Sequence, residues 1–247
     1  MSEILLRQCL DDLAAQGKTV KFWLRDDDAV EPSDPLETLL VLARRFQIPI
    51  TLAVIPEPTG AALAEVLRAE SLATIAVHGW NHQSHAGPGE KRQELGGHRP
   101  AAIVLEELHQ GLSKLRGLYS EQLLPMLVPP WNRIDKALLP ALPGLGFTAL
   151  SVFGREKRGA VLALLNTHVD VMDWHGTRGG RDADILFAEL AAYLAAESEP
   201  LQAVGILTHH LVHDQTVWDF LTRLFTLTAT HPACRWESAR TLLQQQA

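Results

Sequence analysis

Short apolar segments with β character alternate with amphipathic helical segments along nearly the whole chain, and this alternation restricts the fold more than any other feature. Two of the segments, I-T-L-A-V-I and A-V-G-I-L-T, are almost continuously apolar, which is typical of parallel strands buried on both faces. We expect strands at Val20–Arg25, Ile48–Ile55, Leu72–Val77, Pro125–Val128, Phe147–Val152, Val161–Thr167 and Ala203–Thr208, and a weaker eighth at Cys234–Trp236.

Helical patterns fill the intervals between these strands, and a short amphipathic helix is expected near the N-terminus. Uninterrupted alternation of β and α elements implies a parallel sheet, and seven or eight repeats favour a closed or slightly open (β/α) barrel. No G-x-G-x-x-G follows the first strand, which argues against a dinucleotide-binding sheet. The helices are expected at Pro35–Phe46, Gly60–Ala69, Pro100–Leu118, Asp135–Leu142, Asp182–Glu197, Asp214–Thr230 and Glu237–Gln245.

Composition and charge narrow the classes of partner. The 247 residues show no Pro/Ser-rich linker and are predicted to form a single domain, 1–247. A net charge of -7 without a long basic run makes nucleic acid and anionic membranes unexpected partners. No apolar stretch reaches the roughly 18–20 residues that a membrane span needs. Two cysteines exclude a disulfide framework, and the acidic N-terminal residues do not fit a signal peptide, so a cytoplasmic location is expected. No feature indicates an oligomeric state.

Polar segments follow the predicted strands at one end. They are R-D-D-D at 25–28, H-G-W-N-H at 78–82, P-P-W-N-R at 129–133, N-T-H-V-D-V-M-D-W-H at 166–175 and T-H-H at 208–210. The carboxyl ends of barrel strands share one rim, which is where such folds place their chemistry. Most of the eleven histidines occur in or next to these segments, namely His78, His82, His85, His168, His175, His209, His210 and His213. This distribution indicates a metal site or a proton-transfer site.

The residue types favour a metal. Three consecutive aspartates repel one another, and burying them requires a cation or paired bases. The alternative interpretation is that the three aspartates lie in a solvated loop. His78 and His82 are separated by three residues, so both imidazoles can face one ion. Two imidazoles and a carboxylate form a facial triad with open positions for water and substrate. Zinc suits these ligands first, and cobalt, nickel, manganese or iron can use the same set.

Two further features lie near this rim. His209 ends a predicted strand among apolar residues, where it could protonate a leaving group or simply bind backbone. By strand alternation, His210 is expected on the opposite side. The loop Ala86–Arg99 follows the histidine pair and is the best candidate for a lid over the site.

Together the segments resemble the motifs of the polysaccharide deacetylases, which form carbohydrate esterase family 4 and contain the NodB-homology domain. The resemblance covers roughly residues 20–215. It implies a deformed (β/α)7–8 barrel that removes acetyl groups from N-acetylated sugars with a divalent metal. H-G-W-N-H at 78–82 matches the family's H-[ST]-x-x-H, with Gly79 in place of Ser or Thr. His78 and His82 are therefore implied to be metal ligands.

The aspartate run resembles the family motif T-F-D-D-G in more than one alignment. If Ala29 takes the place of the family's glycine, Asp27 is the catalytic base and Asp28 is the third metal ligand. This alignment also suits the distance to the next strand. In the alternative alignments Asp26 is the base, and either Asp27 or Asp28 binds the metal.

The remaining motifs imply roles for residues at the other strand ends. V-P-P-W at 128–131 resembles R-x-P-[YFW] and makes the Trp131 N–H an oxyanion donor. Its arginine is replaced by Val128, so Arg25 or Arg133 is expected to orient the base. D-V-M-D-W at 170–174 and L-T-H at 207–209 resemble the last two motifs. They imply that Trp174 lines the acyl pocket, that Asp170 or Asp173 binds an arginine or the acid histidine, and that His209 is the general acid.

The expected function is a metal-dependent hydrolase that removes an acetyl or other acyl group from an N-acetylated sugar or a small N-acyl substrate. Its expected partner is therefore a small molecule or an oligosaccharide. Two alternatives remain open at this point. One is a hydrolase of a non-carbohydrate C–N bond, an amide or a ureide, on the same barrel. The other is a carbohydrate-binding relative without catalytic activity.

Overall fold

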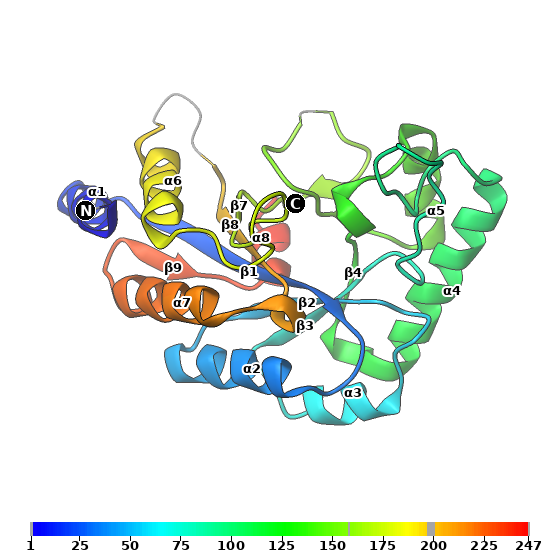
Figure 1. Ribbon diagram of the computed structural model, residues 1–247, viewed down its shortest axis with the longest axis horizontal. Coiled ribbons are helices and arrows are strands. Elements are labelled where there is room, and N and C mark those ends of the chain that lie inside the picture. The colour runs from blue at the N-terminus through cyan, green and yellow to red at the C-terminus, as the bar shows by residue number, and fades with distance from the viewer. Residues whose placement is uncertain (1, 158, 197–200, 247) are drawn as a thin grey trace.

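A sheet of parallel strands forms the centre of the protein, whose computed structural model describes residues 2–157, 159–196 and 201–246 (Figure 1). The strands are β1 (Val20–Ala29), β2 (Ile50–Val54), β3 (Ala73–Val77), β4 (Leu123–Leu127), β5 (Ala149–Leu150), β6 (Ala163–Leu164), β7 (Val169–Asp170), β8 (Val204–Thr208) and β9 (Cys234–Trp236). Their order is β6-β5-β4-β3-β2-β1-β8-β7, and β9 pairs with the start of β1.

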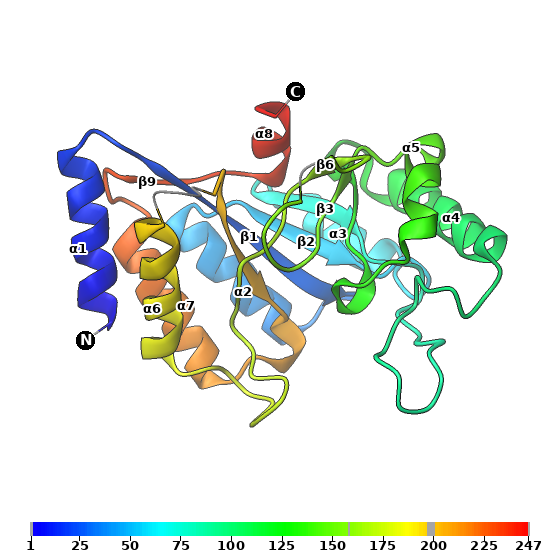
Figure 2. The ribbon, with the colours of Figure 1, turned by 90° about the horizontal axis from the view of Figure 1, so that it is seen from above.

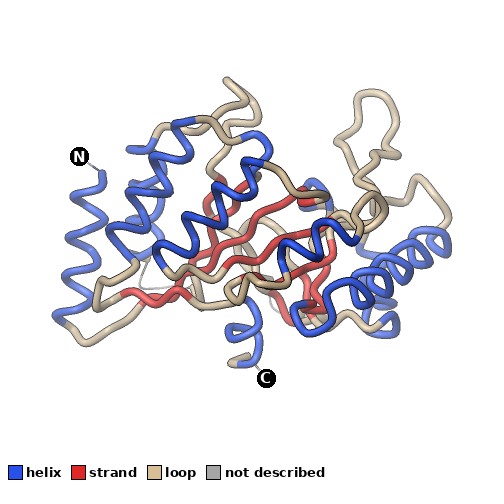
Figure 3. Tube along the Cα trace, turned by 90° about the horizontal axis from the view of Figure 1, so that it is seen from below, coloured by secondary structure: helices blue, strands red, loops and turns tan. Residues whose placement is uncertain are grey.

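Helices cover the outer face of this sheet, as Figures 1 and 3 show. The α-helices are α1 (Ser2–Ala15), α2 (Asp34–Phe46), α3 (Ala61–Leu67), α4 (Ala101–Tyr119), α5 (Leu142–Leu145), α6 (Ala183–Ala195), α7 (Gln215–Thr228) and α8 (Ala239–Gln244). The 3-10 turns are η1 (Ser120–Gln122), η2 (Pro130–Asn132), η3 (Lys136–Ala141) and η4 (His210–Val212). None of the helices in the described part of the chain is long and apolar enough to cross a membrane.

The two edge strands of the sheet, β6 and β7, are consecutive in sequence, and the short segment between them draws the two edges together, so the sheet curls into a barrel. β6 and β7 are separated by residues 165–168, and this segment bonds to both sides of the sheet. Thr167 donates its N–H to Val152 O at 3.0 Å, and His168 donates its N–H to Gly205 O at 2.7 Å. The prediction of a deformed (β/α) barrel is therefore confirmed. The predicted strand Val161–Thr167 is correct in place but is reduced to the two-residue β6.

Residues of β1 alternate between an outer and an inner core. Phe22 and Leu24 pack in the outer core with the helices. Trp23 points inside, where it meets small side chains such as Ala53 and Ala76 and residues of α8. Its Nε1–H donates to Asn166 O at 3.0 Å. Side chains alternate along a strand, so the residues that follow Trp23 at spacings of two also face the barrel interior.

Several predicted boundaries need correction. The first strand was expected to end at Arg25, but β1 continues to Ala29, so the three aspartates lie within the strand rather than after it. The predicted helix Asp135–Leu142 is instead the 3-10 turn η3, which contains Pro140, a residue that removes a helical N–H donor. The helix predicted to reach Glu197 is described as far as Ala195, and Glu197 lies outside the described residues.

Gly205 allows Trp23 to fill the barrel, and we expect Gly205→Ala to destabilise the protein by about 1–3 kcal/mol through overpacking. A Cβ at this position would meet Trp23 Nε1 and lie 2.7 Å from the backbone Cα of Thr167. Gly117→Ala on exposed α4 is the control, because a Cβ there has no neighbour within 4 Å. Urea unfolding measures both free energies, and equal stability of the two variants would contradict this account of the core.

Candidate functional site

Three potential metal ligands meet at the carboxyl ends of β1 and β3. Asp28 Oδ1 lies 3.1 Å from His78 Nε2 and 3.3 Å from His82 Nε2. One donor atom from each residue can be chosen so that all three lie within 4.8 Å of one another. The structure thus brings together the three residues that the preferred alignment predicts as ligands.

A bulge in β1 directs Asp28 toward the histidines. Asp26 pairs with Leu52 and Ala29 pairs with Val54, so two residues of β1 lie opposite one residue of β2. Such a bulge turns a side chain away from the regular alternation. Asp28 adopts a φ of 71°, a left-handed conformation that costs a non-glycine residue of order 1–3 kcal/mol. Backbone of this kind is concentrated at functional sites.

Hydrogen bonding and charge prepare the donor atoms. His78 Nδ1 lies 2.9 Å from Val128 O, so it donates its N–H there, and its Nε2 is the ring nitrogen that faces Asp28 Oδ1, at 3.1 Å. Burial alone raises the pKa of Asp28, but its hydrogen bond to His78 and the nearby histidine charges hold that pKa well below its usual range. Burial and the charge of His78 lower the pKa of His82. Burial lowers the pKa of His78, but the charges of Asp27 and Asp28 outweigh this and raise it. A metal binds a carboxylate and neutral imidazoles, so its binding here would displace a proton from His78 Nε2.

This donor set fits a divalent metal ion. Two imidazole nitrogens and one carboxylate oxygen suit zinc and other first-row metals, and they occupy only one side of an ion. His78 is buried, whereas the Asp28 side chain is 30 % exposed. A solvent-facing carboxylate therefore leaves access for water and substrate.

A buried ion pair lies beside this cluster inside the barrel. Arg25 is fully buried, and its Nε lies 2.9 Å from Asp27 Oδ1 while its Nη2 donates to Asp27 Oδ2 at 3.0 Å. The guanidinium also donates to Asn132 Oδ1 and Ser151 Oγ, each at 2.7 Å. A planar guanidinium bound on several sides holds its carboxylate partner in a defined orientation. Arg133 instead donates to Arg92 O at 2.9 Å, so Arg25 is the arginine that contacts Asp27.

His209 lies on the other side of Asp27. Its Nε2 is 4.0 Å from Asp27 Oδ2, and its ring packs edge-on against Trp174 with centroids 4.7 Å apart. Trp174 Nε1 donates to Asp170 Oδ2 at 2.9 Å. The His209 N–H donates to His213 Nε2 at 3.2 Å, and burial lowers the pKa of His213 to about 4, which keeps it a neutral acceptor. Asp170, Trp174 and His209 are thus one contiguous group.

The aromatic residue of the third polar segment, P-P-W-N-R, lies next to the ligands. Trp131 is in η2 with a φ of 54°, and its ring centroid is 4.3 Å from that of His82. Trp131 therefore borders the ligand cluster, whereas Trp174 borders His209. The adjacent Asn132 binds Arg25, so η2 supplies contacts to both parts of the site.

Two aspartates that were candidates from sequence lie elsewhere. Asp26 is fully buried, and its carboxylate accepts from Thr208 Oγ1 at 2.7 Å and from the His210 N–H at 2.9 Å, and also pairs with His210 Nδ1. Burial raises the pKa of Asp26, but the charge of His210 outweighs this and lowers it. Asp173 accepts from the N–H groups of Gly176 and Thr177 and stabilises an exposed turn. Neither carboxylate is directed into the cluster.

Sequence reasoning missed three residues that contact the site. Asn132 and Ser151 bind the Arg25 guanidinium, and Glu94 accepts hydrogen bonds from the backbone between His78 and His82. Asn132 had a signal, because it lies in the P-P-W-N-R segment that follows a strand. Glu94 had none, because it is one of several charged residues in a polar loop.

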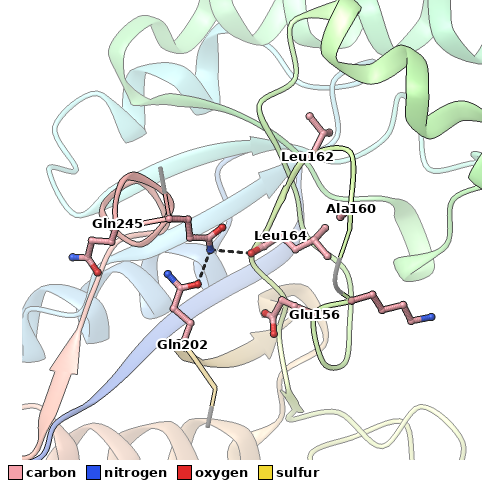
Figure 4. A pocket seen from close by; sticks show the side chains of 8 residues that line it. Glu156, Ala160, Leu162, Leu164, Gln202 and Gln245 are labelled. Atoms are coloured by element: carbon pink, nitrogen blue, oxygen red, sulfur yellow. Dashed lines mark hydrogen bonds between the residues drawn. The ribbon is translucent and has the colours of Figure 1, made fainter. Parts of the chain in front are cut away.

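A separate cavity of about 510 Å³ is lined by Gln202 and by residues of the segments 156–164 and 245–246 (Figure 4). Gln246 Nε2 donates to Leu164 O at 3.0 Å and to Gln202 Oε1 at 2.8 Å at its edge. None of the residues that line it belongs to the cluster around Asp28. Among the residues that the structure describes, its lining contains three glutamines, Glu156 and Lys157, and no histidine.

Solved structures resemble this chain over most of its length. A candidate polysaccharide deacetylase from Mycobacterium smegmatis is 16% identical with a TM-score of 0.68, covering 93% of this chain and 90% of that one. A family 4 carbohydrate esterase from Streptomyces lividans, in complex with acetate, is 15% identical with a TM-score of 0.56, covering 86% and 90%. A family 4 acetyl xylan esterase from Clostridium thermocellum, in complex with a cobalt ion, is 12% identical with a TM-score of 0.56, covering 92% and 91%.

No protein-family model matches this chain, and no curated protein sequence matches it. The likeness is therefore one of three-dimensional structure at low sequence identity. It agrees with the resemblance that the five short motifs indicate. The chain has the deformed (β/α) barrel fold of the family 4 carbohydrate esterases, the polysaccharide deacetylases.

Proposed function

We propose that this protein is a metal-dependent hydrolase that removes an acetyl or other acyl group from an N-acetylated sugar or a small N-acyl substrate. The observation that carries the proposal is the position of Asp27. Its carboxylate is paired with Arg25, comes directly before the bulged ligand Asp28 in sequence and lies 4.0 Å from His209 Nε2. A base and an acid beside a set of metal ligands are what hydrolysis of an amide requires.

Asp28, His78 and His82 would hold one divalent metal ion. When bound, the ion would polarise the substrate carbonyl and lower the pKa of water, which is the Lewis-acid chemistry that an amide hydrolase needs. Zinc is our first choice, with cobalt, nickel, manganese or iron as alternatives, because all of them accept imidazole and carboxylate ligands. The structurally similar acetyl xylan esterase is in complex with a cobalt ion, which supports a metal ion in this fold.

The protein's own groups divide the proton transfers between them. Asp27 accepts the proton from the attacking water, and Arg25 keeps its carboxylate turned toward the rim. His209 donates a proton to the departing nitrogen, while Trp174 holds its ring from one side. The Trp131 N–H donates to the developing oxyanion, a contribution often worth about 3–4 kcal/mol per donor. Trp174 also lines the space for the acyl group.

The contact between Arg25 and Asp27 favours an enzyme over a binding protein without activity. Val128 replaces the arginine of the R-x-P-[YFW] motif, so in an enzyme another residue must orient the catalytic base Asp27. Arg25 approaches Asp27 with two nitrogens and is itself held by Asn132 and Ser151. Burying the charge of an arginine destabilises a protein unless an anion pairs with it. The buried Arg25 therefore requires a carboxylate at position 27.

We expect metal binding to depend on the histidine pair. Wild-type protein purified without chelator should contain about one equivalent of metal per chain, and a His78→Ala/His82→Ala variant should contain almost none, because two of three ligands are removed. Elemental analysis measures both. His98→Ala is the control, since His98 pairs with Glu90 in the outer loop and should leave metal content unchanged. Absence of metal in the wild type after soaking with zinc or cobalt would rule out the site.

Asp27→Asn should reduce turnover by about 10²–10⁴-fold, because an amide cannot accept the proton. Metal content should stay near that of the wild type. The variant also leaves buried Arg25 without its anionic partner, so unfolding free energy is measured alongside kcat. Asp219→Asn on the exposed face of α7 is the matched control. A parallel loss of metal would instead make Asp27 a ligand, and unchanged kcat would remove it from the mechanism.

A substrate panel should separate deacetylation from other C–N hydrolysis. We expect acetate release from N-acetylated sugars or from small N-acetyl amines with wild-type protein, and no turnover with the His78→Ala/His82→Ala variant. Cleavage of ureides with no acetate release would contradict the proposed substrate class. Ion chromatography of acetate and ammonia distinguishes the two reactions in one assay.

A further inference from the structure

A buried carboxylate outside the ligand set binds the backbone that carries the two histidines. Glu94 is 1 % exposed and lies in the loop between β3 and α4, which projects from the barrel in Figure 2. Its Oε1 accepts from the N–H groups of Trp80 at 2.9 Å and Asn81 at 3.0 Å. Its Oε2 accepts from the N–H of His82 at 3.2 Å. Three successive amides are therefore directed to one side chain.

The backbone conformation explains this convergence. Gly79 has a φ of 60° and His82 has a φ of 58°, so left-handed residues bracket the segment. Turns of this kind direct consecutive N–H groups into a concavity that accommodates an anion. Here the anion is the Glu94 carboxylate. The segment that it fills begins after His78 and ends at His82, so its shape determines how far apart the two imidazoles lie.

Gly79 is required by this arrangement. A Cβ at position 79 would meet Glu94 Oε2 and would lie 2.7 Å from Pro130 Cγ. The sequence H-G-W-N-H departs from the H-[ST]-x-x-H pattern at this same position. Glu94 thus occupies space that a serine or threonine side chain would need, and it supplies hydrogen-bond acceptors to this turn from outside the motif.

We propose that Glu94 is a positioning residue that holds the His78–His82 turn in its metal-binding shape, with His82 as the ligand most directly affected. This inference rests on the proposed metal site. Glu94 makes no contact with the reacting atoms and acts through the backbone N–H of His82. Partners that orient metal ligands typically change metal affinity by about 10–100-fold when they are altered.

The neighbouring residue anchors the loop independently, which makes the proposal testable. Leu95 is fully buried in the outer core, and its carbonyl accepts from the Asp135 N–H at 2.8 Å. Arg133 also binds the loop through Arg92 O. A substitution at position 94 should therefore leave the loop attached to the barrel and change only the turn that Glu94 binds.

Glu94→Gln is the main variant because it keeps the shape of the side chain. Its single oxygen can accept from Trp80 and Asn81, but its NH2 group then faces the N–H of His82, so one hydrogen bond becomes a contact between two donors. We expect the Kd for zinc or cobalt to rise by roughly 10–100-fold and the visible spectrum of the cobalt form to change. Competition with a chromophoric chelator measures Kd, and thermal unfolding of the metal-free protein checks the fold.

Glu90→Gln is the matched control, because Glu90 is an exposed carboxylate of the same loop that accepts from the Gly87 N–H and contacts His98. It should bind metal as the wild type does. Glu94→Asp, which retains the charge but shortens the reach, replaces Glu94→Gln if the latter does not fold. Wild-type affinity and an unchanged cobalt spectrum in the Glu94 variant would overturn the positioning role. Failure of the wild type itself to bind metal would instead refute the proposed function.

Discussion

The ion pair between Arg25 and Asp27 is the interaction around which the site is organised. A fully buried guanidinium must have its charge and its donors satisfied, and it reaches Asp27 on its own strand, Asn132 in η2 and Ser151 after β5. These contacts cross the barrel interior from β1 to the opposite strands. The need to bury this charge therefore fixes both the orientation of the carboxylate and the position of the loops at the rim.

β1 separates three adjacent aspartates that would otherwise repel one another. Strand alternation turns Asp26 outward to His210 and Asp27 inward to Arg25, and the bulge directs Asp28 to His78 and His82. Each carboxylate thus meets its own cationic or hydrogen-bonding partner, which meets the requirement for burying such a run. The same separation gives the three residues different chemical surroundings.

Much of the site could be predicted because it depends on short-range sequence patterns. His78 and His82 are close in sequence, and His209 and Trp174 occur in motifs that end or follow buried strands. The orientation of several other side chains could not be predicted from local sequence patterns. The outward direction of Asp26, the engagement of Asp173 in a local turn and the contact of Arg133 with the outer loop all depend on backbone turns or on partners distant in sequence. Glu94 carries no local signal, since its role depends on the path of a loop.

The sequence by itself determined the parallel α/β architecture, the rim on which the polar residues gather and the histidine pair, because apolar periodicity and residue spacing are local properties. Only the tertiary structure decided which aspartate faces which partner, that Arg25 takes the place next to Asp27, and that Glu94 supports the turn between the two histidines. These choices depend on a bulge, on left-handed residues and on packing across the barrel. Such features arise when distant segments compete for the same buried space, which no single stretch of sequence encodes.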